Sequence, residues 1–157
     1  MWFNRPSARL WAIVIVWLLV IFGASSDAGS SRHTSRIIGP IVRWLYPAID
    51  DMTLSGVVGF IRKGAHVAEY GILSVLLWRA IRRSRPAPGW SWQGRSALWA
   101  WSLATAYAAT DEYHQSFVPS RTGQWQDTAL DSCGAALGLL LTWCWFHWRS
   151  SRRPAAL

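Results

Sequence analysis

Three clusters of ionisable and polar side chains interrupt an otherwise apolar chain of 157 residues, of which 52% are hydrophobic. In chain order the clusters are Lys63, His66, Glu69 and Tyr70; then Asp111, Glu112, Gln115 and Arg121; then Asp127 and Asp131. Carboxylates and imidazoles can transfer protons, bind a divalent cation, or accept hydrogen bonds from amines and sugar hydroxyls. Which chemistry is available depends on how the chain brings the three clusters together.

Helical periodicity predicts that the members of each cluster share one helix face. At about 100° per residue, the first cluster falls on a face about 120° wide. Asp111, Glu112 and Gln115 fall within about 100° of one another. The third cluster shares an arc of about 60° with Gly134 and Gly138, whose spacing allows two helices to approach closely. All three clusters can therefore face one interior.

Glu69 lies inside an apolar run, about 9 Å deeper along the predicted helix than Lys63. A charged carboxylate near the middle of a membrane costs roughly 2.5 to 3.5 kcal/mol, and such residues usually face the interior of a helix bundle. We therefore expect Glu69 to have a partner on another helix. Arg121, in the loop that follows the second cluster, is the expected counter-ion of the acidic group.

Four apolar runs predict the elements that position these side chains. The expected spans are residues 10–26, 64–82, 96–115 and 128–148, all of helical length for a membrane, without the period-two alternation of barrel strands. The chain is therefore predicted to be a single all-α domain over residues 1–157, an integral membrane four-helix bundle. The first run also ends in small residues that fit a signal-peptide cleavage site, and we favour a retained anchor.

The segment between the first and second spans is the only sizeable one expected outside the cytoplasm. Residues 25–35 read as a polar linker. Apolar residues at helical spacing between positions 37 and 45 predict a short amphipathic helix on the outer membrane surface. Asp50 and Asp51 are predicted to cap a turn that begins near Thr53.

The charge distribution predicts the orientation. The chain carries 16 Lys and Arg against 8 Asp and Glu, a net charge of +8. The N-terminus, the loop between the second and third runs, and the C-terminus together contain ten cations and no acid, whereas the remaining segments contain six cations and all eight acids. The positive-inside rule therefore places both termini in the cytoplasm of a multi-pass protein of the cell membrane. The basic charge indicates topology, so no nucleic-acid partner is expected.

Aromatic residues fit the same orientation. Several of the 13 Trp residues, including Trp78, Trp92, Trp99, Trp145 and Trp148, fall near the predicted inner boundary of the membrane. Tryptophan is enriched at membrane interfaces because its ring is apolar and its N–H is polar. These residues are therefore predicted to form an aromatic belt.

The clusters also carry a family resemblance. The blocks are Lys63-x-x-His66-x-x-Glu69-Tyr70, Asp111-Glu112-x-x-Gln115-x-Phe117-x-Pro119-x-Arg121, and Asp127-x-x-x-Asp131-x-x-Gly134. Taken in order over residues 63–138, they resemble VanZ-like membrane proteins, a family named for a protein associated with resistance to the glycopeptide teicoplanin. The resemblance implies a four-helix protein of the cell envelope. The family usually has Asn where this chain has Asp131.

Three functional hypotheses follow. In the first, the protein is a binding module whose partners are membrane lipids and a lipid-linked cell-wall precursor or glycopeptide. The candidate ligand-binding residues are Lys63, Tyr70, Gln115, Arg121, Asp127 and Asp131. A module of this kind holds phosphate or carboxylate with its cations and accepts hydrogen bonds with its acids.

In the second hypothesis the protein is a membrane enzyme, with His66, Glu69, Asp111 and Glu112 as general acid and base groups or as ligands of a divalent metal. The sequence contains no HExxH, Walker loop, GxSxG elbow or cysteine-based metal motif, so no metal or cofactor is assigned. In the third, the charged residues only lock helices together. Lys63 or Arg121 would pair with Asp111 or Asp127, and His66 would hydrogen-bond to Glu69 or Gln115.

Overall fold

The computed structural model describes residues 5–26, 31–84, 92–118 and 124–152, and within these ranges every regular element is a helix. The helices are α1 (Arg5–Ser25), α2 (Ser31–Leu45), α3 (Asp51–Ser84), α4 (Gly94–Gln115) and α5 (Trp125–Ser151). The all-α prediction is confirmed, and each predicted span coincides with one of α1, α3, α4 and α5 to within a few residues, except that α3 begins much earlier.

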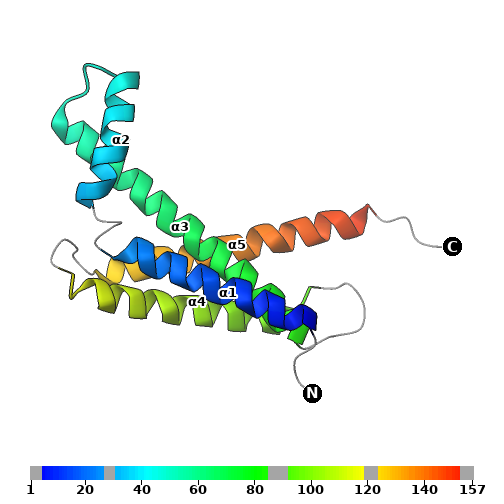
Figure 1. Cartoon of the computed structure of the whole chain (residues 1–157). Coiled ribbons are helices and arrows are strands. Elements are labelled where there is room, and N and C mark those ends of the chain that lie inside the picture. Colours follow the sequence, from blue (N-terminus) through cyan, green and yellow to red (C-terminus); the bar gives the residue numbers. More distant parts are fainter. Residues whose placement is uncertain (1–4, 27–30, 85–91, 119–123, 153–157) are drawn as a thin grey trace.

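Helix α3 holds the fold together, because it packs against all four other helices (Figure 1). Helices α4 and α5 also pack against each other, and α1 packs across α3 and α4. Side chains on the shared faces form a core that includes Val14, Tyr70, Leu73 and Ala104. Alanines at four-residue intervals along α4 keep that helix close to its neighbours, as is common where membrane helices associate.

The closest helix pair is α3 with α5, and it depends on glycine. A Cβ atom on Gly134 would lie 2.6 Å from the carbonyl oxygen of Val67, and one on Gly138 would overlap the backbone of Gly71. At the same level the hydroxyl of Ser74 donates a hydrogen bond of 2.8 Å to the carbonyl oxygen of Ala135. The predicted small-residue strip is therefore the contact surface that sets the spacing of these two helices.

Helix α3 is longer than a membrane requires. Its 34 residues extend about 51 Å, whereas about 20 residues cross the hydrocarbon of a bilayer. The first turns of α3 project from the other helices together with α2 (Figure 1). An ion pair between Arg43 and Asp51 joins α2 to α3.

The start of α3 follows the predicted cap. The Asp50 carboxylate accepts hydrogen bonds from the backbone N–H of Thr53 at 2.9 Å and from the Thr53 hydroxyl at 2.7 Å. The predicted polar linker is wrong in part, because residues 31–35 belong to α2. Packing along α3 stabilises α2 despite Pro40, which cannot donate the usual helical hydrogen bond.

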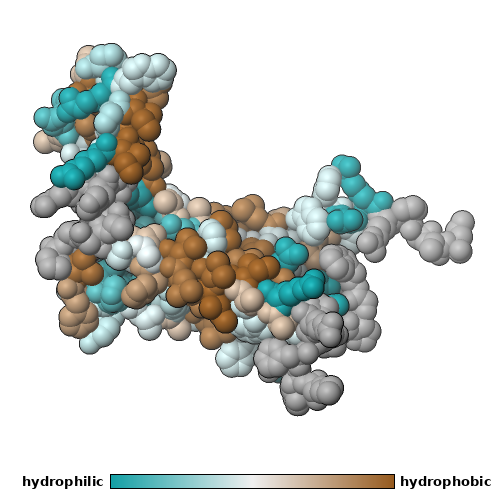
Figure 2. Space-filling model, in the orientation of Figure 1, coloured by the Kyte–Doolittle hydropathy of each residue, from teal (hydrophilic) through white to brown (hydrophobic). Residues whose placement is uncertain are grey.

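The outer faces of the helices are apolar. Among the described residues, α5 and the part of α1 from Ser7 to Ser25 are long and apolar enough to cross a membrane. Large side chains on them, such as Leu19 at 65% and Leu141 at 61%, are exposed, and Figure 2 shows a hydrophobic patch in the region of α1. Helices α3 and α4 do not meet the same criterion, because α3 contains charged residues and α4 contains several Ser, Thr, Trp and Tyr residues.

The tryptophans near the predicted inner boundary divide into two groups. Trp78 is only 2% exposed, stacks on Trp92 at a centroid distance of 4.9 Å and meets Phe146 edge-on at 5.4 Å. The expectation that Trp78 belongs to an aromatic belt is therefore wrong, because it is part of the core. Trp99, Trp145 and Trp148 are exposed, as an interfacial belt requires.

Candidate functional site

The three clusters meet where α1 and α4 end and α5 begins, and Asp111 lies at the centre of the hydrogen-bond network there. Its Oδ2 atom accepts hydrogen bonds from Ser25 Oγ at 2.6 Å, Gln115 Nε2 at 3.1 Å and Tyr70 OH at 3.3 Å. These donors come from α1, α4 and α3, and Asp111 itself is 3% exposed. The other oxygen, Oδ1, is buried and accepts no hydrogen bond from the described residues. Asp111 thus joins three helices through one of its two oxygens.

Asp131 has a different environment. It is 1% exposed, and neither of its carboxylate oxygens accepts a hydrogen bond from the described residues. Its nearest ionisable neighbour is His66 on α3, whose Nδ1 atom lies 3.6 Å from Asp131 Oδ1, just beyond hydrogen-bond length. The His66 side chain is 20% exposed and lies on the path from the surface to Asp131. Asp131 therefore retains unused acceptor capacity in a buried position.

Two further acids, Asp127 and Glu112, make contacts at the start of α5. Lys63 Nζ lies 3.5 Å from Asp127 Oδ1, which confirms the expected pairing of these helices. Because the Lys63 side chain is 64% exposed, this pair contributes little stability and leaves the ammonium accessible. Glu112 accepts a hydrogen bond of 2.9 Å from the backbone N–H of Gln124, the residue before α5, so it orients the start of that helix.

Two predicted site residues remain to be placed. Glu69 is half-buried on α3, and its backbone carbonyl accepts a hydrogen bond of 3.0 Å from Trp17 Nε1 on α1. Arg121 lies outside the described residues. The structure thus brings together Lys63, His66 and Tyr70 with Asp111, Asp127 and Asp131, as the shared helix faces predicted.

The structure adds contacts within the cluster that were not expected. His66 has Asp131 as a neighbour, a contact that the sequence did not predict. Tyr70 and Gln115 were predicted to contact a ligand, but both donate to Asp111. Sequence reasoning missed Ser25, because a serine at the end of an apolar run carries no signal of a partner 86 positions away.

The described residues contain no group of three or more His, Cys, Asp or Glu side chains placed to hold a metal ion. The acids are instead distributed over separate contacts: Asp111 with neutral donors, Glu112 with a backbone N–H, and Asp131 beside His66. Asp131 is the acid of which neither oxygen accepts a hydrogen bond from the described residues, whereas Asp111 has one such oxygen.

Comparison with known proteins gives one match. A family model described as VanZ/LLP1 matches residues 10–147, which include all of the site residues named above. No curated protein and no solved structure matches the chain.

Proposed function

The chain belongs to the VanZ/LLP1 family, and from this premise we propose that it is a multi-pass protein of the cell envelope that binds an outer-leaflet ligand at the His66–Asp131 pair. In this proposal α1, α3, α4 and α5 cross the membrane, α2 lies on the outer surface, and both termini are cytoplasmic. Two observations support this topology: the outer faces of the helices are apolar, and the segments placed in the cytoplasm contain ten cations and no acid.

The observation that carries the binding proposal is the carboxylate of Asp131, which is buried without a hydrogen bond from the described residues. A buried acceptor without a donor is costly, and a ligand that supplies an amine or hydroxyl donor removes that cost. The ligand reaches Asp131 past His66, and the accessible Lys63 contacts its phosphate or carboxylate group.

A lipid-linked cell-wall precursor has the required chemistry. It combines sugar hydroxyls and peptide amines with phosphate, and its lipid chain keeps it in the membrane beside the apolar helix faces. By holding such a precursor, the protein would alter the susceptibility of the cell to glycopeptides such as teicoplanin, which act on cell-wall precursors.

Lipid extraction from purified protein tests the proposal. The wild-type protein, purified in mild detergent from cells that make the precursor, should retain it, whereas Asp131→Leu should not. Leucine has the same branching as aspartate and leaves no buried charge. Because it is larger than aspartate at a buried position, thermal unfolding must show that the variant is folded. Asp50→Asn is the control, because it removes one carboxylate far from the site and asparagine also caps helices. Equal retention by wild type and Asp131→Leu would reject the proposal.

A second candidate function is acid–base catalysis on the same ligand. It is favoured by the 3.6 Å approach of Asp131 to one ring nitrogen of His66, an arrangement in which a carboxylate orients an imidazole that acts as a general base. Incubation with the precursor separates the two functions. An enzyme converts it to a new product, and His66→Gln abolishes conversion while binding remains, whereas a binding module returns it unchanged.

A further inference from the structure

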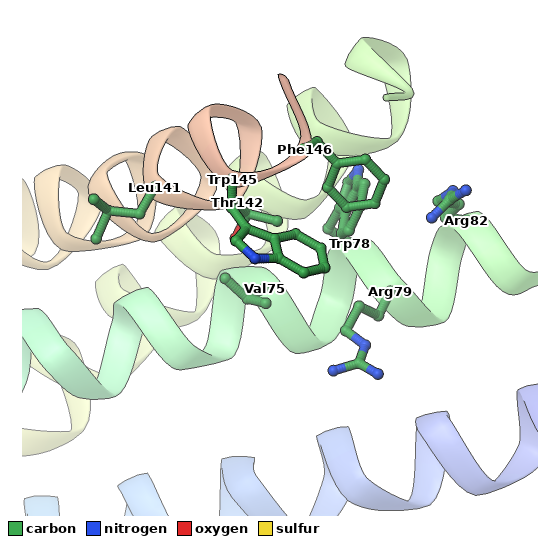
Figure 3. A pocket seen from close by; sticks show the side chains of 8 residues that line it. All are labelled: Val75, Trp78, Arg79, Arg82, Leu141, Thr142, Trp145 and Phe146. Carbon is green, nitrogen blue, oxygen red and sulfur yellow. The ribbon is translucent and has the colours of Figure 1, made fainter. Parts of the chain in front are cut away.

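A cavity of about 460 Å³ lies between α3 and α5, at the end of these helices opposite the His66–Asp131 pair (Figure 3). Its walls are formed by Val75, Trp78, Arg79, Arg82, Leu141, Thr142, Trp145 and Phe146. Figure 3 shows the Trp145 indole projecting from α5 toward α3, with Trp78 beside Phe146. The volume falls within the range of small-molecule sites.

Two guanidinium groups border the cavity. Arg79 and Arg82 are three residues apart on α3 and so share one side of the helix. The guanidinium carbon of Arg82 lies 5.4 Å from the ring centroid of Trp78 and 5.4 Å from that of Phe146, so cation–π contacts orient this cation. Arginine in a fixed orientation binds phosphate through paired hydrogen bonds.

No carboxylate side chain competes for these cations. The sequence contains no Asp or Glu between residues 70 and 110 or after residue 131, so this end of α3, α4 and α5 has arginines alone. The cavity therefore lies in a region of positive potential, which attracts an anion.

Trp78 contributes an aromatic part of the wall. It is 2% exposed and its Nε1 atom is buried, so its N–H does not reach the cavity and its ring supports Arg82 instead. The ligand must then present an anionic group to the arginines.

The opposite wall requires an apolar part in the same ligand. Val75 and Leu141 line the cavity, and Leu141 and Trp145 are exposed on the outer face of α5. The cavity thus continues onto the surface that faces the acyl chains in the proposed membrane orientation. A free phosphate ion would leave this wall uncovered.

We propose that this cavity binds an anionic phospholipid, with its phosphate at Arg79 and Arg82 and the first part of its acyl chains against Val75 and Leu141. Basic pockets between membrane helices on the cytoplasmic side commonly hold anionic headgroups. The inference rests on the proposed membrane embedding but is independent of any ligand at the His66–Asp131 pair.

Native mass spectrometry of the full chain in detergent tests the site with two lipids, phosphatidylglycerol and phosphatidylethanolamine. The wild type should bind phosphatidylglycerol about tenfold more tightly, the size expected for one or two charge-assisted hydrogen bonds. The double variant Arg79→Gln with Arg82→Gln should lose this preference. Arg83→Gln with Arg95→Gln is the matched control, since it removes the same charge at the same end from residues outside the cavity.

Two single changes keep the test valid if the double variant misfolds. Arg79→Gln and Arg82→Gln, made separately, each remove one charge from the cavity and should each weaken phosphatidylglycerol binding severalfold in folded protein. Equal binding of both lipids by the wild type, or equal loss in both double variants, would overturn the inference. Displacement of the lipid by excess inorganic phosphate would overturn the lipid assignment. Extraction of the protein from membranes by alkaline carbonate would instead reject the proposed embedding.

Discussion

Asp111 and Asp131 are both buried acids in the same cluster, yet their neighbours give them different roles. Three side-chain donors on α1, α3 and α4 point at Oδ2 of Asp111, and only Oδ1 is left without a hydrogen bond from the described residues. Asp131 has His66 as its neighbour, and neither of its oxygens accepts a hydrogen bond from the described residues. We therefore propose a structural role for Asp111 and ligand contact for Asp131.

The donors to Asp111 should differ in their contribution to stability. Ser25→Ala removes a hydrogen bond of 2.6 Å and should lower the free energy of unfolding by about 1 to 3 kcal/mol, because it leaves a buried carboxylate with fewer donors. Tyr70→Phe removes a longer contact of 3.3 Å and should cost less. Chemical denaturation in detergent measures both, and a larger loss for Tyr70→Phe would contradict the central role of Ser25.

Asp50 should make the start of α3 sensitive to pH. The pKa of its carboxyl lies below the ordinary value of 3.8, chiefly because the backbone N–H of Thr53 donates to the charged form. A folded-state pKa below the unfolded one means that the stabilisation is complete above 3.8 and is lost as the pH falls through the lower, folded value.

Hydrogen exchange of the amides at the start of α3 measures this effect. Protection in the wild type should be constant at neutral pH and should fall only in the acid range below 3.8. Asp50→Asn should remove the pH dependence, since an amide oxygen also accepts from Thr53, and Asp50→Ala should reduce protection throughout. The same acid-range loss in Asp50→Asn would show that another group titrates.

At the scale of whole helices, periodicity and hydropathy predicted most of the architecture. All four predicted spans correspond to helices, and the faces calculated for Lys63, His66 and Tyr70 do point at acids on α4 and α5. The early part of α2 was missed because serine, threonine and arginine carry no apolar repeat. Its helix depends on packing against α3, a contact that local sequence does not encode.

Which residues contact each other across two helices was harder to predict than which residues share one helix face. Angular positions within one helix follow from residue number, but the axial offset between two helices depends on how closely their backbones pack. Here Gly134 and Gly71 determine that offset between α3 and α5, and it places His66 level with Asp131. For this reason the contact between His66 and Asp131 was not predicted.

Larger side chains at the contact between α3 and α5 should therefore destabilise the protein. Gly134→Val and Gly138→Val insert side chains where even a Cβ meets the backbone of α3, so each should destabilise the fold by several kcal/mol or prevent folding. Gly64→Ala is the control on α3, because a Cβ there meets nothing within 4 Å, and alanine should stabilise the helix by about 1 kcal/mol. Thermal unfolding in detergent compares the three, and a well-folded Gly138→Val would contradict the close contact.

At the scale of the whole molecule, the two ends have opposite charge character. All eight acids of the chain lie between residues 27 and 131, whereas the opposite end of α3 and α5 contains arginines without acids. We propose that this polarity gives the two sites different ligands: donor groups at the His66–Asp131 pair and an anionic headgroup at Arg79 and Arg82.

Cysteine labelling tests the orientation. In a chain whose native Cys133 and Cys144 are replaced by alanine, Ser35→Cys on α2 should react with a membrane-impermeant maleimide in intact cells. Ser151→Cys at the end of α5 should react only after the membrane is permeabilised. Labelling of both positions from the same side would contradict the proposed topology.

The most direct test of the central claim is the dissociation constant of a purified lipid-linked peptidoglycan precursor from the protein in nanodiscs. We predict saturable binding to the wild type and to Asp50→Asn, and binding at least about tenfold weaker in Asp131→Leu, as expected when a buried charge-assisted contact is lost. An equal dissociation constant for wild type and Asp131→Leu, with both proteins folded, would contradict the assignment of this site.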